Sequence, residues 1–318
     1  TGTHGMRVPG AWDRTTGSGA TVAVIDTGIT SHPDLDRNVV PGYDFISNSA
    51  AARDGGGRDS NPRDEGDWYA AGECGTAGAS DSSWHGTHVA GTVAAVADSQ
   101  GVVGVAPNAK IQPIRVLGKC GGSLSDIADA VVWAAGGTVA GVPANPNPAD
   151  VINMSLGGSG MCGTTYQNAI NAAVSRGVPV VVAAGNENQP AANVRPANCQ
   201  NTIVVAASTS QGARASFSNY GSAVDVTAPG ANIISTVNNG ATTPTTAGHA
   251  AYNGTSMATP HVAGLAALLL AAQPSLTPAQ VESTLRSTAR SMPVTCSAGC
   301  GAGLADAARA VSSLGGSS

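Results

Sequence analysis

The chain has 318 residues, of which 42% are hydrophobic and 11% are charged, and its formal net charge is −5. Its 15 Lys and Arg residues are scattered, which argues against a nucleic-acid partner. No apolar run reaches the roughly 18 residues that a membrane-spanning helix needs. We expect a single monomeric domain over residues 1–318, with its core at about 19–310 and a candidate linker stub at 313–318.

Five short runs rich in Val, Ile and Ala predict strands that are buried on both faces. They cover residues 20–25, 111–116, 151–154, 178–183 and 203–207. Helical patterns cover residues 88–97, 124–135, 165–176, 257–271, 278–287 and 303–312. Because strands and helices alternate over most of the chain, the sequence predicts a three-layer α/β/α fold with a mostly parallel central sheet.

Residues 47–83 interrupt this alternation with a polar stretch that is rich in Gly and carboxylates. A segment of that length without regular structure is usually functional or tethered. Its carboxylates include Asp54, Asp59, Asp64 and Asp67. Clustered carboxylates repel one another unless a cation or water separates them, so the insert is either a calcium site or a solvated acidic loop.

Three polar residues lie where predicted elements begin or end. Asp26 directly follows the first strand, at the edge where parallel sheets place their sites, although Asp also suits a turn there. Ser256 opens the apolar helix, whose free N–H groups favour negative charge, although Ser is also a common N-cap. His85 lies just before the helical pattern of residues 88–97, facing the strand ends, and His88 is expected to be a packed core residue.

The blocks around these residues resemble the motifs of the subtilisin family of serine peptidases; they are residues 24–28 (VIDTG), 85–91 (HGTHVAG) and 254–264 (GTSMATPHVAG). By this resemblance Asp26 orients the imidazole, His85 is the general base and Ser256 is the nucleophile. Asn186 is implied as the side-chain donor to the oxyanion. The chain is then a secreted serine endopeptidase of broad specificity, acting on proteins or peptides, with its own pro-segment as an inhibitor.

The resemblance also implies where a substrate chain lies. Ser155, Leu156 and Gly157 resemble the family's edge segment, which pairs with the substrate main chain. The segment that holds Gly118 and Gly121 resembles the opposite wall of the family's substrate-binding site. The pocket for the residue before the cleaved bond includes Ala183, Ala184 and Gly185. Because these residues are small, we expect a preference for bulky apolar residues at that position.

Calcium is the cofactor that the resemblance implies, in a structural role. Residues 96–102 resemble the family's calcium loop, with the ligand set Asp34, Val96, Asp98, Gln100 and Val102. A further family ligand, from a longer N-terminal arm, has no counterpart here. The second candidate is the insert, because subtilisin relatives with this kind of insert bind calcium there; its ligands would be Asp54, Asp59, Asp64 and Asp67.

Six cysteines suit a few stabilising bridges in an oxidising compartment, although their number leaves the connectivity open. Cys296 and Cys300 are close enough to close one loop. We further pair Cys162 with Cys199 and Cys74 with Cys120, the latter fastening a loop of the insert near the active site. The alternative is a cytosolic protein with free buried thiols.

Two rival functions follow from the same residues. One is a catalytically silent member of the fold that acts as a calcium-stabilised binding module. The other is a metallopeptidase that uses His85 and His88, although the HxxH spacing lacks the Glu of a zincin and no third ligand is evident nearby. A serine peptidase loses its activity in Ser256→Ala. A metallopeptidase loses its activity with a zinc chelator and keeps it in Ser256→Ala.

Overall fold

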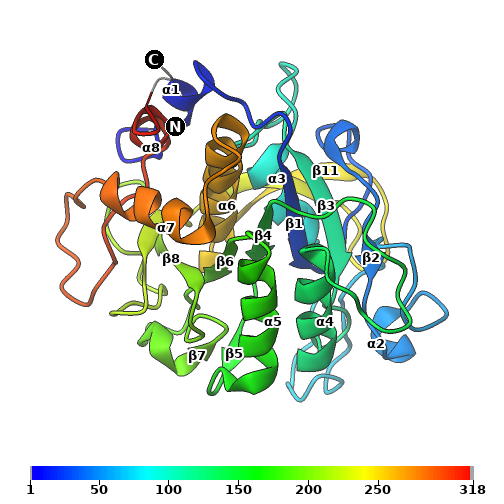
Figure 1. The fold of residues 1–318 in the computed structure, drawn as a ribbon. Helices are drawn as coiled ribbons and strands as arrows, with labels where there is room; N and C mark the ends of the chain where they lie inside the picture. The colour runs from blue at the N-terminus through cyan, green and yellow to red at the C-terminus, as the bar shows by residue number, and fades with distance from the viewer. Residues whose placement is uncertain (1, 316–318) are drawn as a thin grey trace.

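The computed structural model describes residues 2–315 and has a seven-stranded sheet at its centre, with helices on both faces (Figure 1). In sheet order the strands are β2 (Tyr43–Asp44), β3 (Lys110–Arg115), β1 (Thr21–Asp26), β4 (Val151–Met154), β6 (Val180–Ala183), β8 (Thr202–Ser208) and β9 (Val226–Pro229). Every neighbouring pair is parallel. The predicted three-layer α/β/α fold is confirmed.

Two hydrophobic cores flank the sheet. One core packs α3 (His85–Ala94) and α6 (Thr255–Ala272) against one face, and the other packs α4 (Leu124–Ala134) and α5 (Gly163–Ser175) against the opposite face. The remaining helices are α1 (Val8–Trp12), α2 (Ser49–Ala52), α7 (Pro278–Ser287) and α8 (Ala307–Ser312). Strands β2 and β3 lie on one side of β1, and β4, β6, β8 and β9 lie on its other side. The order in which the chain adds strands to the sheet therefore reverses at β1. Open α/β sheets bind ligands at such a point.

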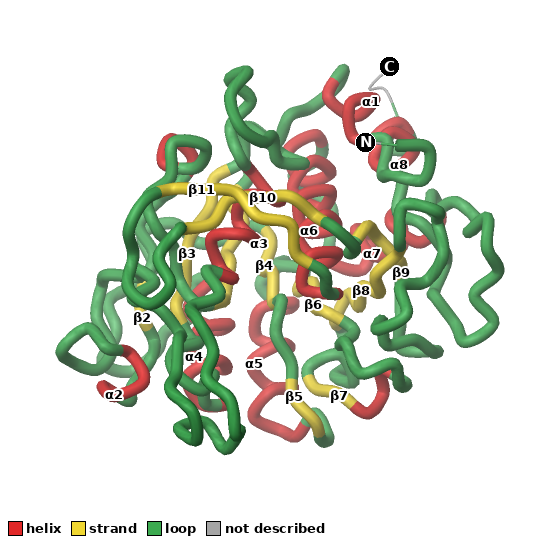
Figure 2. The backbone as a smooth tube through the Cα atoms, turned by 180° about the vertical axis from the view of Figure 1, so that it is seen from behind, coloured by secondary structure: helices red, strands yellow, loops and turns green. Residues whose placement is uncertain are grey.

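Two small antiparallel sheets complete the fold. The first joins β5 (Gly158–Ser159) to β7 (Val194–Arg195), and the second joins β10 (Ile233–Asn238) to β11 (Ala247–Tyr252). Figure 2 shows the β10–β11 hairpin running across α3. Two buried hydroxyls fasten this contact, because Ser235 donates to the carbonyl oxygen of His88 and Thr236 donates to that of Thr87. The hairpin therefore helps to hold the helix that begins at His85.

The structure contains the five predicted strands and the six predicted helices, most of them with shifted ends, and adds elements that the sequence pattern does not indicate. The strand of residues 151–154 and the helix of residues 278–287 have the predicted bounds. Strand β2 has only two residues, and the exposed strand β11 carries no apolar run. The last predicted helix begins at Ala307 rather than at residue 303, because Asp306 caps it by accepting from the Arg309 N–H at 3.0 Å. Residues 316–318 of the candidate linker stub lie outside the described residues.

The expectation that no segment has the length and apolar character of a membrane span needs a correction. Helix α6 has 18 residues with a mean hydropathy of 1.4, and 78% of that segment is buried inside the molecule. A helix that is apolar all round is typical of a protein core. Here α6 belongs to the core on the same side of the sheet as α3.

The insert of residues 47–83 is more ordered than the sequence predicts. It contains α2, and isolated bridges join Ile29 to Arg63 and Asp44 to Asp59. Its backbone therefore pairs with the loop that follows β1 and with the edge strand β2. This pairing places part of the insert next to Asp26 instead of in solvent.

Candidate active site

Asp26 ends β1 at the carboxyl edge of the sheet and is completely buried. Its Oδ1 atom accepts from the Nδ1 atom of His85 at 2.7 Å and from the N–H of Thr27 at 2.7 Å. Burial alone would lower the pKa of His85, but the adjacent Asp26 carboxylate outweighs it and raises that pKa above the ordinary value. Because Nδ1 donates to Asp26, the Nε2 atom of neutral His85 is left as the basic nitrogen.

His85 is the first residue of α3, and His88 lies one turn further along it. His88 is completely buried, and its Nε2 atom donates to the carbonyl oxygens of Ile233 at 2.9 Å and Ala250 at 3.1 Å. Burial lowers the pKa of His88 to about 4. With that nitrogen bound to carbonyl oxygens, His88 is a packed core residue, and among residues 2–315 neither histidine belongs to a group that could hold a metal.

Ser256 is the second residue of α6, and its Oγ atom donates to the carbonyl oxygen of Ser155 at 3.2 Å. In turn the Ser155 hydroxyl donates to the carbonyl oxygen of Ser256 at 2.8 Å. Pro260 lies inside α6, not in its first turn, and has no N–H to give to Ser256 four residues earlier. The Ser155 hydroxyl occupies the place of that missing helical hydrogen bond.

The structure brings Asp26 and His85 together but directs the Ser256 hydroxyl to Ser155. A hydrogen bond between Ser256 and His85 is not among the contacts of this conformation. Such bonds often tighten only when substrate binds, and a hydroxyl changes its partner by rotation about the Cα–Cβ bond.

Asn186 is fixed by the start of α6. Its Oδ1 atom accepts from the N–H of Thr255 at 2.7 Å and from the Thr255 hydroxyl at 2.9 Å, which directs its Nδ2 atom the other way. A Cβ atom on Gly254 would lie 3.6 Å from the Ser256 nitrogen and 3.7 Å from Asn186 Nδ2. Two N–H donors thus border one small volume that Gly254 leaves free, at a helix N-terminus that favours negative charge.

A cavity of about 270 Å³ lies between the two predicted substrate walls. Gly121 lines it on one side, and Leu156 and Gly157 line it on the other. Gly118 does not line it: a Cβ atom there would lie 2.3 Å from the carbonyl oxygen of Ala51, so this glycine permits close packing on α2. Among the other lining residues is Cys120.

The remaining predicted substrate residues have structural contacts. Ser155 is 2% exposed, and its hydroxyl is engaged with Ser256 rather than free for a substrate. Ala183 and Ala184 are buried at the end of β6. The Gly185 N–H donates to the Thr255 hydroxyl at 3.1 Å, which joins the end of β6 to the start of α6.

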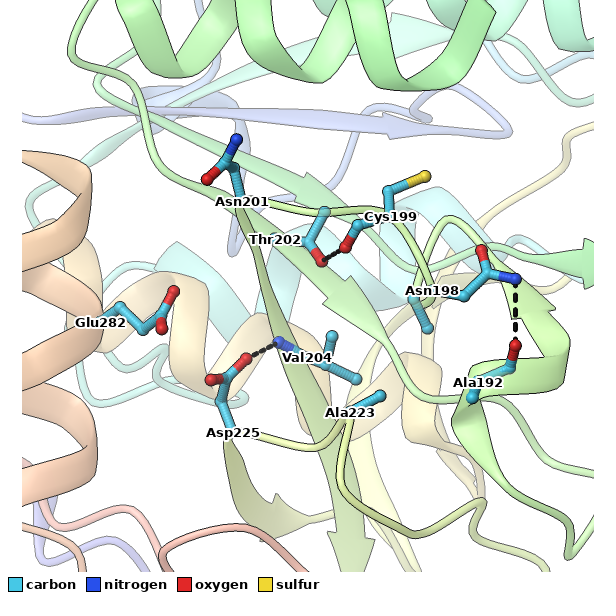
Figure 3. Close-up of a pocket in the computed structure, with 10 residues that line it drawn as sticks. Ala192, Asn198, Cys199, Asn201, Thr202, Val204, Ala223, Asp225 and Glu282 are labelled. Atoms are coloured by element: carbon cyan, nitrogen blue, oxygen red, sulfur yellow. Dashed lines mark hydrogen bonds between the residues drawn. The ribbon is translucent and has the colours of Figure 1, made fainter. Parts of the chain in front are cut away.

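A separate cavity of about 320 Å³ has none of these residues in its lining (Figure 3). Glu282 of α7 and Asp225 both line it, and the Asp225 carboxylate accepts from the Val204 N–H at 2.8 Å. Arg286 pairs with the same carboxylate at 3.1 Å. Asp225 therefore ties β8 to α7, which is a structural role.

The carboxylates of the insert divide into two groups. Asp54 and Asp59 gather with Asp44, with ligand oxygens within 4.8 Å of one another. Burial and a hydrogen bond with Asp54 raise the pKa of Asp44 to about 7, although the buried Arg115, which pairs with Asp44 at 2.9 Å, opposes this rise. Sequence reasoning missed Asp44, whose only signal is its place one residue after Tyr43 in a very short strand.

Asp64 and Asp67 do not join that group, which corrects the predicted ligand set. Asp64 is 1% exposed and accepts from the Thr27 hydroxyl at 2.8 Å. Asp67 accepts from the N–H of Ser83 at 2.6 Å and from its hydroxyl at 2.8 Å. Both carboxylates bind chain segments next to Asp26 and His85, because the insert folds back on the site.

The loop of residues 96–102 encloses Asp34, as predicted, but the side-chain contacts differ. The Oδ2 atom of Asp34 accepts from the Val102 N–H at 3.0 Å and from His249 Nε2 at 2.9 Å. Asp98 is exposed and accepts from the N–H of Gln100 at 3.0 Å. Among the His, Cys, Asp and Glu side chains of the described chain, His32 and His249 gather with Asp34, and Asp98 does not.

Three disulfides join Cys74 to Cys120, Cys162 to Cys199 and Cys296 to Cys300, the pairing given by the sequence analysis. The first one ties the insert to a residue that lines the 270 Å³ cavity. An ion pair between Glu73 and Lys119 lies beside it. The insert is thereby fastened to the cavity wall.

The model of the "Subtilase family" matches residues 17–303. The chain is 63% identical over 310 residues to an "Extracellular protease" of Xanthomonas campestris pv. campestris, covering 96% of this chain and 53% of that protein. It is 48% identical over 326 residues to an "Extracellular basic protease" of Dichelobacter nodosus, covering 98% and 54%. The chain thus spans about half the length of these two relatives.

Solved structures agree with this assignment. A protease of Pseudoalteromonas arctica superposes with a TM-score of 0.96 at 58% identity, covering 98% of this chain and 94% of that one. A cold-adapted subtilisin-like serine proteinase superposes with a TM-score of 0.70 at 36% identity, covering 92% and 90%. On sequence and structure together, this chain belongs to the subtilase family.

Proposed function

We propose that this chain is a secreted serine endopeptidase that hydrolyses peptide bonds through an acyl-enzyme. The observation that carries the proposal is the 2.7 Å contact between His85 Nδ1 and Asp26 Oδ1, on the side of the sheet where Ser256 lies in the first turn of α6. Family membership and two relatives named as extracellular proteases support both the activity and the location.

In the proposed reaction, the Ser256 hydroxyl turns from Ser155 to His85 and attacks the substrate carbonyl carbon. His85 Nε2 takes the hydroxyl proton, while Asp26 holds the imidazole and stabilises its positive form. The carbonyl oxygen becomes an oxyanion that receives hydrogen bonds from the Ser256 N–H and from Asn186 Nδ2. His85 then passes the proton to the leaving amine, and water attacks the acyl-enzyme by the reverse sequence.

The raised pKa of His85 suits this role. A base is effective when its pKa lies near the working pH, because it then accepts a proton readily and is still largely unprotonated. The buried carboxylate of Asp26 supplies the negative charge that stabilises the imidazolium.

We propose that a protein or peptide substrate lies between the Gly121 and Leu156 walls, pairing its main chain with residues 155–157. The 270 Å³ cavity between those walls has room for an apolar side chain. This supports a broad specificity for extended chains. The preference for bulky apolar residues immediately before the cleaved bond is part of the same proposal.

We propose that calcium stabilises the insert at Asp44, Asp54 and Asp59. Three carboxylates within 4.8 Å of one another suit a hard cation, which would add to the positive charge that Arg115 brings to Asp44 and Asp54. A second ion in the loop of residues 96–102 would have to displace His249 from Asp34. Catalysis itself needs no metal in this proposal.

We further propose that the enzyme acts as a monomer, that its own pro-segment inhibits it before processing, and that the loop held by Cys74–Cys120 contacts large substrates. The proposed activity is tested with a chromogenic peptide and with casein. The parent hydrolyses both, whereas Ser256→Ala and His85→Ala lower kcat by about 10⁴-fold or more. Full activity in Ser256→Ala, or its loss only with a zinc chelator, would contradict the proposal.

A further inference from the structure

Three chain segments meet behind His85: the loop after β1, the insert and the first turn of α3. Their backbones are in close contact, because a Cβ atom on Gly28 would lie 2.3 Å from the carbonyl oxygen of Pro62. Similarly, a Cβ atom on Gly86 would lie 2.2 Å from the carbonyl oxygen of Gly28. The start of α3 therefore packs against the loop after β1, and that loop packs against the insert.

The Thr27 hydroxyl connects all three segments. It donates to Asp64 Oδ2 at 2.8 Å and accepts from the N–H of Gly86 at 2.8 Å. The second oxygen of Asp64 accepts from the N–H of Gly66 at 2.9 Å. Thr27 is 2% exposed and Asp64 is 1% exposed, so water does not compete for these bonds.

The direction of the hydroxyl proton matters here. A threonine hydroxyl has one proton and two lone pairs. Because the Asp64 carboxylate takes the proton, a lone pair of the Thr27 oxygen faces the Gly86 N–H. The first N–H groups of a helix have no partner within the helix, so Asp64, acting through Thr27, supplies a partner to the residue that follows His85.

A second carboxylate of the insert makes the same arrangement on the other side. Asp67 accepts from the Ser83 hydroxyl at 2.8 Å, and the Ser83 oxygen accepts from the N–H of His85 at 3.3 Å. Each of the first two N–H groups of α3 is thus held by a hydroxyl, and each hydroxyl is oriented by one carboxylate of the insert.

We infer that Asp64 and Asp67 are positioning residues for His85, acting through the hydroxyls of Thr27 and Ser83. They fix the backbone from which the imidazole extends, and so keep its Nε2 atom directed at the nucleophile. This inference rests on the proposed peptidase function. Small misplacements of a catalytic group can lower a rate by about 10²-fold, so the contacts matter for turnover as well as for folding.

The test compares Thr27→Val, which removes the hydroxyl, with Thr27→Ser, which keeps it. The matched control is Thr227→Val, because Thr227 is also buried and its hydroxyl donates to the carbonyl oxygen of Cys300 at 3.0 Å in β9. We expect kcat on a peptide substrate to fall about 10- to 100-fold in Thr27→Val, with KM within about twofold. Thr27→Ser should recover most of kcat, and folded Thr227→Val should keep it.

A folded Thr27→Val enzyme with the parent's kcat overturns the inference, as does a parallel loss in the Thr227→Val control. If Thr27→Val does not fold, Asp64→Asn and Ser83→Ala decide: a lowered kcat at unchanged KM supports the inference, and a parental kcat in both overturns it. Failure of all three to fold also overturns it, because the contacts would then hold the fold rather than the imidazole. An inactive parent refutes the proposed function and this inference together, whereas an active parent with unaffected variants refutes the inference alone.

Discussion

Ser155 and Ser256 exchange two hydrogen bonds, each hydroxyl donating to the other residue's carbonyl oxygen, at 2.8 Å from Ser155 and 3.2 Å from Ser256. The first bond compensates for the N–H that Pro260 lacks, and the second holds the Ser256 hydroxyl in its resting position. The residue that follows the buried strand β4 is thereby linked to the proposed nucleophile.

Replacing Ser155 by Ala tests this link. The change leaves the Ser256 carbonyl oxygen without a donor, which costs about 1–3 kcal/mol for a buried group. We expect a lower free energy of unfolding in urea, measured in the inactive Ser256→Ala background to avoid self-digestion. Ser159→Ala, in the exposed strand β5, is the control, and an equal loss in both variants would contradict the role of Ser155.

Asn186→Ala removes one of the two proposed oxyanion donors. Such a loss lowers kcat by about 10²–10³-fold, because the interaction forms fully only in the transition state. KM should change little, and the thermal midpoint should fall only modestly. Steady-state kinetics on a chromogenic peptide give the result, and a kcat equal to that of the parent would exclude Asn186 from the oxyanion site.

The pH dependence of kcat/KM follows from His85. The imidazole must be neutral to accept a proton, and Asp26 raises its pKa above the ordinary value of 6.5. Activity should therefore decline as the pH falls through a midpoint above 6.5, and Asp26→Asn should move that midpoint down while lowering the rate. Asp67 and Asp64 also face His85 and raise the pKa of its imidazole, and His88 lies one turn further along α3. An acid midpoint near 4 would contradict this assignment.

Calcium binding at the insert predicts a stability change. A cation at 100 times its dissociation constant stabilises a folded protein by about 2.7 kcal/mol, so a chelator should lower the thermal midpoint by several degrees. In the Ser256→Ala background, Asp59→Asn should reduce this difference, whereas Asp13→Asn, an exposed acid outside the cluster, should keep it. A midpoint that does not respond to the chelator would exclude calcium here.

The sequence predicts much of the site because each main residue lies at the boundary of a strong pattern. Asp26 ends an apolar run, and Ser256 opens an apolar helix, so their positions follow from local signals. Asp44 could not be found in that way, since its strand has two residues and its partners come from the insert.

The sequence grouped Asp64 and Asp67 with Asp54 and Asp59 as calcium ligands, and the structure separates them for a related physical reason. Carboxylate density along a chain indicates a cation site only if the side chains converge, and convergence depends on how the loop folds. Here the pairing of residue 63 with Ile29 turns Asp64 inward onto Thr27. Local sequence patterns likewise do not predict the β10–β11 hairpin, and therefore do not predict the contact between His249 and Asp34.

We propose that His85 makes the Ser256 hydroxyl nucleophilic. The rate at which a fluorophosphonate labels the protein measures this directly, with the modified residue located by mass spectrometry. We expect a single adduct on Ser256, formed about 10²–10⁴-fold more slowly in His85→Ala. An adduct on another residue, or labelling of Ser256 at the same rate in His85→Ala, would contradict it.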